Sequence, residues 1–494
     1  MEIKNFTPRP YQENILNTSR QKNTLVVLPT GTGKTKIAIL LAIDRLNKFP
    51  NSKVLICTPT KPLSAQIYRE FIDFSTIEEK SILLFTGAIP PKKREKIWNS
   101  ATVIVATPQT IQSDLEKNRI FLENFSLLCI DEAHRSRLKY ANTFVAKIYN
   151  QQAKFPKILA LTASPGGTKE KIDEICKNLL IESIEIRSVY DEDVKSYIQK
   201  KDVEWIEVEL PEEFKKVRLE IKKSYDIKLK ELKKFGLTKP LNLINKKDLL
   251  QMQIQLQKSL RNKNPAAFYG ISVIAQLLKL NYMLELIETQ GITQLKKYWS
   301  KLSKEESKAA KNIVQDKNVF QAVESLNITT KHPKMIKLLS IAKEQLKSNP
   351  KSKIIIFANY RDTVREISSN LNSLNGIRAI ELMGQKEGIT QKQQLSTIKD
   401  FGNEKYNCLV GTSITEEGLD IKGGADLAIF YEPIPSEIRL IQRLGRVGRI
   451  SKGKIIILIT KNTRDVAYYW SSKRKEKNMK KILYKMKQEN LTNF

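Results

Sequence analysis

The sequence predicts an α/β protein with two parallel-sheet domains and an all-helical insertion domain between them. Short apolar strands alternate with helical stretches over roughly the first 190 residues. The alternation gives way to a Lys-rich helical region in which Gly and Pro are sparse, and it returns after residue 335. We therefore expect an α/β domain at 1–200, a helical domain at 205–330, a second α/β domain at 335–470 and a basic helical tail at 471–494.

The charge of the chain points to a polyanionic partner. Among 494 residues, 85 Lys and Arg stand against 53 Asp and Glu, which gives a formal net charge of +32. An excess of this size would repel itself if it were spread evenly, so nucleic acid or an anionic membrane surface is the natural partner. A Lys-rich background composition accounts for part of the excess. The tail lacks the aromatic amphipathic character of a membrane-surface helix, which favours nucleic acid.

Cysteine and histidine usage excludes several classes of protein. The four Cys are widely scattered without a C-x-x-C pair, and three lie in apolar strand-like runs, so buried reduced thiols are expected. Two His leave no plausible zinc site. The N-terminus has no apolar signal-peptide core, and no apolar run approaches membrane-spanning length. These features predict a soluble, cytoplasmic protein with no membrane association.

The first strand leads into a Gly-rich turn and then a helix. An apolar run, 25–28, precedes the turn PTGTG at 29–33, and Lys34-Thr35 opens an apolar helix. This arrangement suits a phosphate-binding loop, in which backbone N–H groups and the helix N-terminus face an anion, the Lys adds charge and the Thr hydroxyl ligates Mg²⁺. The full pattern has Gly where this chain has Leu28, and a chance GTGKT is the alternative. The expected nucleotide-binding residues are Thr30, Gly31, Thr32, Gly33, Lys34 and Thr35.

Polar clusters follow four other predicted strands of the first domain. They are TPTK at 58–61, TPQT at 107–110, DEAH at 131–134 and TAS at 162–164. In a parallel sheet all carboxyl ends meet at one edge, where ligands bind. A single such cluster would be an ordinary loop, but together with the phosphate loop they predict one continuous site.

Adjacent carboxylates end the strand LLCIDE. Metal-assisted phosphoryl transfer needs one carboxylate to hold Mg²⁺ and another to orient or deprotonate the attacking water. We assign Asp131 to the metal and Glu132 to the water; the alternative is an acidic loop. His134 is expected to link the nucleotide site to its surroundings.

The region at 205–330 has helical periodicity with one buried stripe. Ile274, Leu277, Leu278 and Tyr282 follow helical spacing, and Gly291 is placed to end that helix. The many Lys residues of this region either grip phosphate or form a solvated face, and the residues alone do not decide between these two possibilities.

The second α/β domain has no phosphate loop, so it should complete the first site rather than form its own. Its segment QRLGRVGR carries Arg446 and Arg449, three residues apart with small Gly residues beside them. Guanidinium groups on a γ-phosphate raise the rate by around 10³–10⁵-fold. These arginines therefore predict a nucleotide in the cleft between two domains; the alternative is a basic helix that touches only phosphate backbone. In the tail, Ile482, Leu483 and Met486 suggest packing on a domain.

These segments occur in a known order. LPTGTGKT, TPTKPL, ATPQT, DEAH, LTASP, IIIFANY, GTSITEEGLD and QRLGRVGR resemble the motifs of superfamily 2 helicases in order and approximate spacing. The resemblance covers most of the chain and implies two RecA-like domains with nucleic acid running across both. The segments RPYQ at 9–12, DEAHR, the helical insert and RDVAYYWSSKRKEKNM at 464–479 look like the archaeal Hef and FANCM branch. Leu28 agrees with that branch, whose phosphate loops often lack the first Gly.

The resemblance implies roles for further residues. Gln12, helped by Arg9, would read adenine, while Gln442 and Asp420 would lie near the γ-phosphate or ribose. Thr162 and Ser164 would couple hydrolysis to movement. Contacts with the nucleic-acid backbone would come from Thr60, Lys61, Thr107, Gln109, Asn359, Thr412 and Ser413. Because backbone contacts carry no sequence information, the protein should select structures rather than sequences.

Hef proteins commonly continue into a nuclease, and no E-R-K-type nuclease cluster occurs in this chain. Either the chain is the helicase part of a longer protein or the natural protein lacks the nuclease; the ending QENLTNF fits a natural C-terminus slightly better.

The function expected from these features is an ATP- and Mg²⁺-dependent helicase or translocase that remodels branched DNA such as stalled forks and Holliday junctions. A nuclease or sliding clamp is a possible partner by resemblance. Two alternatives remain open. One is a duplex-RNA-activated ATPase of the RIG-I or Dicer type, and the other is a nucleotide-switched nucleic-acid clamp that does not unwind.

Overall fold

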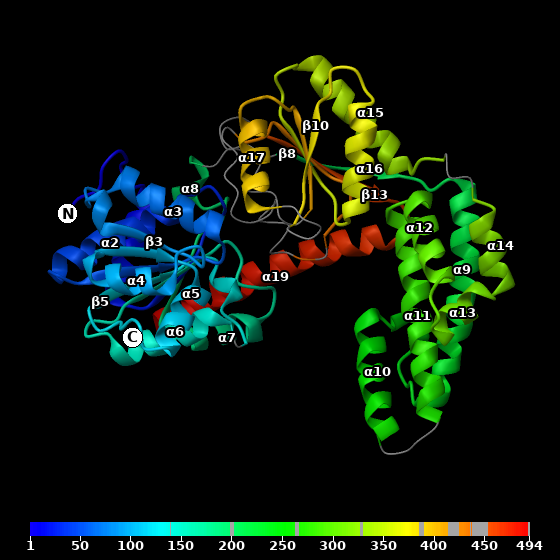
Figure 1. The fold of residues 1–494 in the computed structure, drawn as a ribbon, viewed down its shortest axis with the longest axis horizontal. Coiled ribbons are helices and arrows are strands. Elements are labelled where there is room, and N and C mark those ends of the chain that lie inside the picture. Colours follow the sequence, from blue (N-terminus) through cyan, green and yellow to red (C-terminus); the bar gives the residue numbers. More distant parts are fainter. Residues whose placement is uncertain are drawn as a thin grey trace.

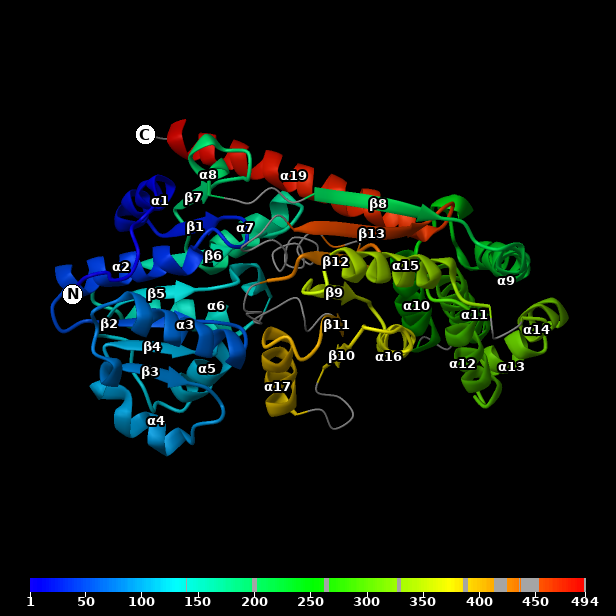
Figure 2. The same cartoon turned by 90° about the horizontal axis from the view of Figure 1, so that it is seen from above.

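The chain folds into two parallel α/β domains and a helical domain, arranged in a row with the second α/β domain in the middle (Figures 1 and 2). The computed structural model describes residues 1–138, 140–197, 202–261, 266–326, 330–384, 390–412, 424–434, 436 and 453–492. The predicted fold class is confirmed.

The first domain contains a seven-stranded, fully parallel sheet with the order β3-β4-β2-β5-β6-β1-β7. Its central strands are buried on both faces, which is why they are continuous apolar runs in the sequence. Because all strands run the same way, the loops after β1, β2, β4, β5 and β6 emerge at one edge. The strands are β1 (Thr24–Val27), β2 (Lys53–Cys57), β3 (Ile82–Phe85), β4 (Val103–Ala106), β5 (Phe125–Ile130), β6 (Ile158–Thr162) and β7 (Ser183–Ile186).

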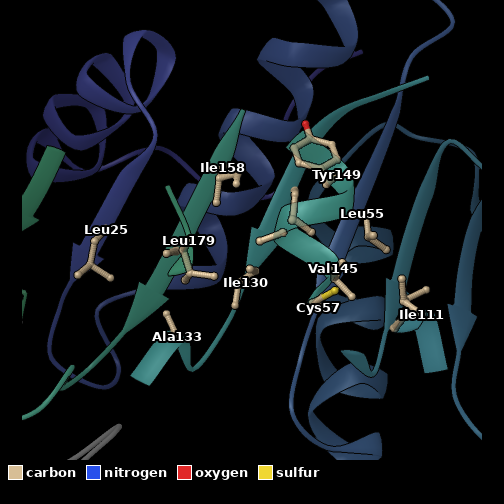
Figure 3. Packing of buried hydrophobic residues seen from close by; sticks show 14 of the residues in the cluster. Leu25, Leu55, Cys57, Ile111, Ile130, Ala133, Val145, Tyr149, Ile158 and Leu179 are labelled. Atoms are coloured by element: carbon tan, nitrogen blue, oxygen red, sulfur yellow. The ribbon is translucent and has the colours of Figure 1, made fainter. Parts of the chain in front are cut away.

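Helices cover both faces of this sheet because successive strand residues point to opposite sides. Val26 packs in one core with α1, α2 and α3. Leu25 packs in the other, with residues of α5, α6 and α7. Figure 3 shows this second core, in which Ile130 and Ala133 are the residues directly before and after the predicted acidic pair. The helices are α1 (Pro10–Gln21), α2 (Lys34–Lys48), α3 (Lys61–Phe74), α4 (Pro91–Ile97), α5 (Pro108–Glu116), α6 (Ala141–Gln152), α7 (Lys169–Asn178) and α8 (Glu192–Lys195).

The second domain has a six-stranded parallel sheet with the order β10-β11-β9-β12-β13-β8. Its edge strand β8 precedes the helical domain in the chain, whereas the other five strands follow it. The helical domain is therefore inserted into the second α/β domain. The strands are β8 (Asp202–Val208), β9 (Ile354–Phe357), β10 (Ala379–Leu382), β11 (Cys408–Gly411), β12 (Leu427–Phe430) and β13 (Lys454–Thr460).

The second sheet is also covered on both faces. Buried residues of α15 (Pro333–Ser348) and α16 (Arg361–Asn372) pack on one face. On the other face, α17 (Gln391–Gly402) and the start of α19 (Arg464–Thr492) contribute Phe401 and Tyr469.

The helical domain is built around α11, and its buried residues form one core. Gly291 ends α11 as expected: its N–H donates to Leu286 O at 2.8 Å, and its φ of 111° suits Gly. Of the helices that the structure describes, α11 is long and apolar enough to span a membrane by length and composition, contrary to the expectation that no apolar run approaches that length. It is the core helix of this domain, with Ile274 and Leu277 fully buried. The helices are α9 (Glu212–Glu231), α10 (Lys246–Arg261), α11 (Ala266–Thr289), α12 (Ile292–Ser303), α13 (Lys308–Val314) and α14 (Lys317–Glu324).

Helix α19 connects all three domains. It starts beside the helical domain and runs along the second domain to the first (Figure 2). Leu483 is fully buried in the first domain's core, and Ile482 and Met486 pack against it, which confirms that the tail packs on a domain. This helix begins at Arg464, so the basic tail expected at 471–494 is the continuation of a longer helix.

Three strands were not expected from the sequence: β7, β8 and β10. The boundary expected at 205 falls within β8, which pairs with β13 along seven residues and belongs to the second sheet.

Candidate nucleotide and nucleic-acid site

The loop after β1 has the backbone geometry of the predicted phosphate-binding turn. Gly31 and Gly33 have positive φ values of 82° and 74°, which other residues adopt only with strain. A Cβ added to Gly33 would lie 2.8 Å from Gln12 Nε2, so the loop also requires Gly for space. Lys34 is the first residue of α2, whose N-terminus therefore faces the turn.

Lys34 and Thr32 bond to the loop's own carbonyls. Lys34 Nζ donates to Leu28 O and Pro29 O at 3.2 and 3.3 Å, and Thr32 Oγ1 donates to Pro29 O at 2.7 Å. The ammonium group thus lies over the mouth of the loop, next to the half-buried Thr35.

Helix α1 supports the loop from behind. Tyr11 Oη donates to Thr32 O at 2.5 Å, and Gln12 Nε2 lies 3.3 Å from both Thr32 O and Gly33 O. The Arg9 N–H donates to Gln12 Oε1 at 2.9 Å, so the Gln12 side chain satisfies the backbone donor at the start of α1. Gln12 is 2% exposed, so here it holds the loop; recognition of adenine by Gln12 and Arg9 stays a prediction.

The acidic pair follows β5 directly. The Asp131 N–H donates to Cys57 O at 2.9 Å, which ties it to β2, and Glu132 has a left-handed backbone with φ of 51°. Burial, together with the neighbouring charge of Glu132, raises the pKa of Asp131 to about 7, although Lys34 acts to lower it. The ammonium group of Lys34 therefore acts electrostatically on the carboxyl group of Asp131.

His134 connects the acid pair to β6. Its Nδ1 lies 3.2 Å from Glu132 Oε2 and 3.3 Å from Thr162 Oγ1. Thr162 Oγ1 also accepts the Ser164 N–H at 3.1 Å. Strand β6 lies between β5 and β1, and the Leu28 N–H donates to Thr162 O at 3.1 Å. Four of the predicted residues are thus in one continuous chain of contacts beside the phosphate loop.

Ser164 makes a contact that the sequence did not indicate. Its Oγ donates to Met479 Sδ of α19 at 3.0 Å, and both side chains are buried. The segment after β6 is therefore in direct contact with the helix that arrives from the second domain.

The expected nucleic-acid contacts of the first domain start two helices at the same sheet edge. Thr60 caps α3, and Lys61 is its exposed first residue. Thr107 occupies the N-cap position of α5, where its hydroxyl pairs with that of Thr110 at 2.8 Å instead of capping the helix, and Gln109 is exposed. Because β2 and β4 are neighbours, these two helix starts lie side by side.

In the second domain, Asn359 and Thr412 follow the neighbouring strands β9 and β11. The Ala358 N–H donates to Gly411 O at 3.0 Å, which keeps the two loops together. Asn359 is exposed, and its backbone N–H donates to Glu432 Oε2 at 3.1 Å. Five other predicted site residues lie outside the described residues: Ser413, Asp420, Gln442, Arg446 and Arg449.

The residues present fit ATP with Mg²⁺. The described part of the chain has no group of three or more His, Cys, Asp or Glu side chains able to hold a metal by themselves. This suits Mg²⁺, which is usually held by one or two protein oxygens together with substrate phosphates. Thr35 and Asp131 would hold the ion, and Lys34 with the Gly loop would hold the phosphates. When bound, the ion would neutralise charge that develops on the transferred phosphoryl group.

Tyr11, Met479 and Glu432 are the structural partners that the sequence reasoning missed. Tyr11 lies within the RPYQ segment, so its position was a usable signal. Met479 ends the segment 464–479 quoted above, but its contact with Ser164 and the contacts of Glu432 cross domains, and no local pattern in the sequence predicts such contacts.

Three family models match the chain. They are a DEAD/DEAH box helicase model at residues 9–172, a helical-bundle model of ATP-dependent RNA helicases at 213–332, and a helicase conserved C-terminal domain model at 333–451.

Individual relatives match over nearly the whole chain. A Methanocaldococcus jannaschii protein, provisionally named an ATP-dependent RNA helicase, is 41% identical over 98% of this chain, and the ATP-dependent DNA helicase mph1 of Neurospora crassa is 32% identical over 92%. The chain spans 61% and 41% of the lengths of these two curated relatives. The crystal structure of the Pyrococcus furiosus Hef helicase domain superposes with a TM-score of 0.74 at 43% identity, covering 94% of this chain and 98% of that one. The chain belongs to the ATP-dependent superfamily 2 helicases of the Hef and FANCM branch.

Proposed function

We propose that this protein is an ATP-dependent DNA helicase or translocase that remodels branched DNA such as stalled forks and Holliday junctions. The observation that carries the proposal is the chain of contacts from Glu132 through His134 to Thr162, located beside Lys34 and the phosphate loop. It joins the groups that would hydrolyse ATP to the segment that contacts α19.

Each residue has a defined task in this proposal. Lys34 and the loop hold the phosphates, and Asp131 and Thr35 hold Mg²⁺. Glu132 orients and deprotonates the attacking water. His134, which contacts both Glu132 and Thr162, couples a change at Glu132 to Thr162. Arg446 and Arg449 would stabilise the transferred phosphoryl group, and Gln442 and Asp420 would act at the γ-phosphate or ribose.

DNA would run over the C-terminal edges of both sheets. The DNA backbone would be contacted by the starts of α3 and α5 in the first domain and by the loops after β9 and β11 in the second. A net charge of +32 supports a polyanionic substrate. The helical domain would sense the branch. The protein would act inside the cell, in association with the nucleoid, and a nuclease or sliding clamp would be its protein partner.

Stimulation of ATP hydrolysis by forked DNA, plain duplex DNA and duplex RNA, compared side by side at one salt concentration, tests the proposal. We expect forked DNA to give the highest turnover and the lowest half-saturating concentration. Stimulation by duplex RNA above forked DNA would instead support an RNA-activated ATPase, a candidate that agrees with the naming of the Methanocaldococcus relative as an RNA helicase. Nucleic-acid binding that changes with ATP but never accelerates hydrolysis would identify a nucleotide-switched clamp.

A further inference from the structure

The turn between α11 and α12 of the helical domain reaches into the site edge of the second domain. Gln290, in this turn, is 2% exposed. Its Nε2 donates to Glu432 Oε1 at 2.6 Å, and its Oε1 accepts from Thr363 Oγ1 at 2.6 Å. A buried amide that has a partner at each end has one fixed orientation.

The partners of Gln290 lead to Asn359. Glu432 follows β12, is also 2% exposed, and accepts the Asn359 backbone N–H through its second oxygen at 3.1 Å. Thr363 is fully buried in the first turn of α16, which begins two residues after Asn359. Gln290 therefore holds the Asn359 segment from both sides, through the carboxylate and through the helix.

The position of Gln290 is itself fixed. The Gln290 N–H donates to Leu286 O at 2.9 Å, and the next residue is Gly291, where an added Cβ would lie 3.1 Å from His332 Cβ. Close by, Tyr360 Oη donates to Glu285 Oε1 of α11 at 2.6 Å. The end of α11 thus packs closely against the second domain, so a displacement of α11 would also displace Asn359.

We propose that Gln290 is a positioning residue that couples the helical domain to the nucleic-acid contact at Asn359. The proposal rests on the proposed function, because Asn359 is the expected backbone contact. When the helical domain engages a branch and α11 shifts, the Gln290–Glu432 hydrogen bond would change the position of the Asn359 loop, and the affinity for the bound strand would change with it.

The test compares Gln290→Ala with a matched control, Gln294→Ala. Gln294 is 5% exposed and also bonds across the same joint, from its Nε2 to Glu366 Oε2 at 2.7 Å, but Glu366 lies farther along α16 from Asn359 than Thr363 does. In ATPase assays we expect Gln290→Ala to raise the half-saturating concentration of forked DNA about tenfold, the effect of losing one buried hydrogen bond, with kcat at saturating DNA within about twofold of wild type. For Gln294→Ala, both the half-saturating concentration and kcat should stay within about twofold of the wild-type values.

A double-mutant cycle provides the sharper criterion. In the Asn359→Ala background, Gln290→Ala should raise the half-saturating concentration of forked DNA only a little further, because both changes would act on one DNA contact. Additive effects, or equal effects of Gln290→Ala and Gln294→Ala, would overturn the proposal. If Gln290→Ala does not fold, Thr363→Val can replace it, because this change removes one partner of the same amide with little change in shape. Thr363→Val should also raise the half-saturating concentration of forked DNA.

Amide hydrogen exchange of the full chain without DNA separates this proposal from the proposed function. Exchange of the segment from Asn359 to Thr363 should be about tenfold faster in Gln290→Ala and unchanged in Gln294→Ala. Unchanged exchange in both variants would overturn the coupling even if forked DNA stimulates the wild type. Faster exchange in Gln290→Ala, in a protein that forked DNA does not stimulate, would support the packing link but contradict its role in DNA binding, and with it the proposed function.

Discussion

Lys34 is the residue on which we expect nucleotide binding to depend most directly. Its Nζ lies over the phosphate loop, and its charge lowers the pKa of the buried Asp131. We expect Lys34→Ala to lower ATP turnover by at least about 10²-fold, since one preorganised donor to a reacting oxygen is worth this much. Fluorescence anisotropy should show DNA affinity close to that of wild type. A Lys34→Ala protein that still hydrolyses ATP at the wild-type rate would contradict the phosphate-loop assignment.

His332 makes stability depend on pH. Burial, with the nearby Lys334 charge adding, lowers its pKa well below the ordinary value. The unfolded His332 side chain binds a proton near pH ~6.5, whereas the folded one stays neutral at that pH. The free energy of unfolding therefore has its full value above this pH and decreases as the pH falls below it, by at most about 1.4 kcal/mol per pH unit.

The variant His332→Asn tests this pH dependence. The His332 ring caps α15 by accepting the Lys334 N–H at 3.2 Å, and Asn can replace that bond. The free energy of unfolding of wild type, measured by urea titration, should therefore fall more steeply between pH 7 and 5.5 than that of His332→Asn. Parallel curves for the two proteins would show that His332 is not the cause.

At the residue scale, the sequence predicted those site members that occur in contiguous motifs. The phosphate loop and the cluster from Asp131 to His134 are each local, and a parallel sheet brings the carboxyl ends of their strands together. Gln290 and Glu432 were missed because they interact only after two segments far apart in the sequence have packed against each other. A buried Gln or Glu has no sequence signal of its own.

At the scale of elements, α19 is the part whose packing matters most. Leu483 is fully buried in the first domain's core, so Leu483→Ala should lower the free energy of unfolding by about 2–5 kcal/mol. Lys487→Ala is the control: it removes only a partly exposed ion pair to Glu185 at 2.8 Å and should cost less than about 1 kcal/mol. Urea unfolding measures both. Equal, small losses would show that the end of α19 is not part of this core.

The strands that the sequence analysis missed are all at the edges of their sheets. Central strands such as β5 are buried on both faces and appear as apolar runs. The edge strands β7, β8 and β10 are Ser183–Ile186, Asp202–Val208 and Ala379–Leu382, and each includes Glu between apolar residues. One exposed face or edge relaxes the demand for apolar residues, so periodicity alone does not reveal such strands.

At the scale of the whole molecule, the proposed function divides the catalytic site between the two α/β domains. Lys34 and Glu132 belong to the first domain, whereas Arg446 and Arg449, outside the described residues, belong to the second. Arg446→Ala or Arg449→Ala should lower kcat by about 10³-fold or more while the KM for ATP changes much less, because their contacts form in the transition state. Steady-state kinetics with saturating DNA measures both constants. A large rise in KM with unchanged kcat would remove the transition-state role.

The sequence also predicted three domains, but not that one of them is inserted into another. This insertion depends on the pairing of β8 with β13, which are separated by about 250 residues of chain. No local pattern specifies a pairing over such a distance. Strand β8 brings the chain into the second sheet before the helical domain begins, and the helical domain is consequently held by the second sheet on both sides of the insertion.

Displacement of a labelled strand from forked DNA by the wild-type protein and by Glu132→Gln, with ATP and with a hydrolysis-resistant analogue, tests the central claim most directly. The claim is that ATP hydrolysis at the divided site moves DNA. We predict displacement by the wild type with ATP alone, none with the analogue, and none by Glu132→Gln, although each should still bind the fork. Displacement with the analogue, or by Glu132→Gln at the wild-type rate, would contradict the account.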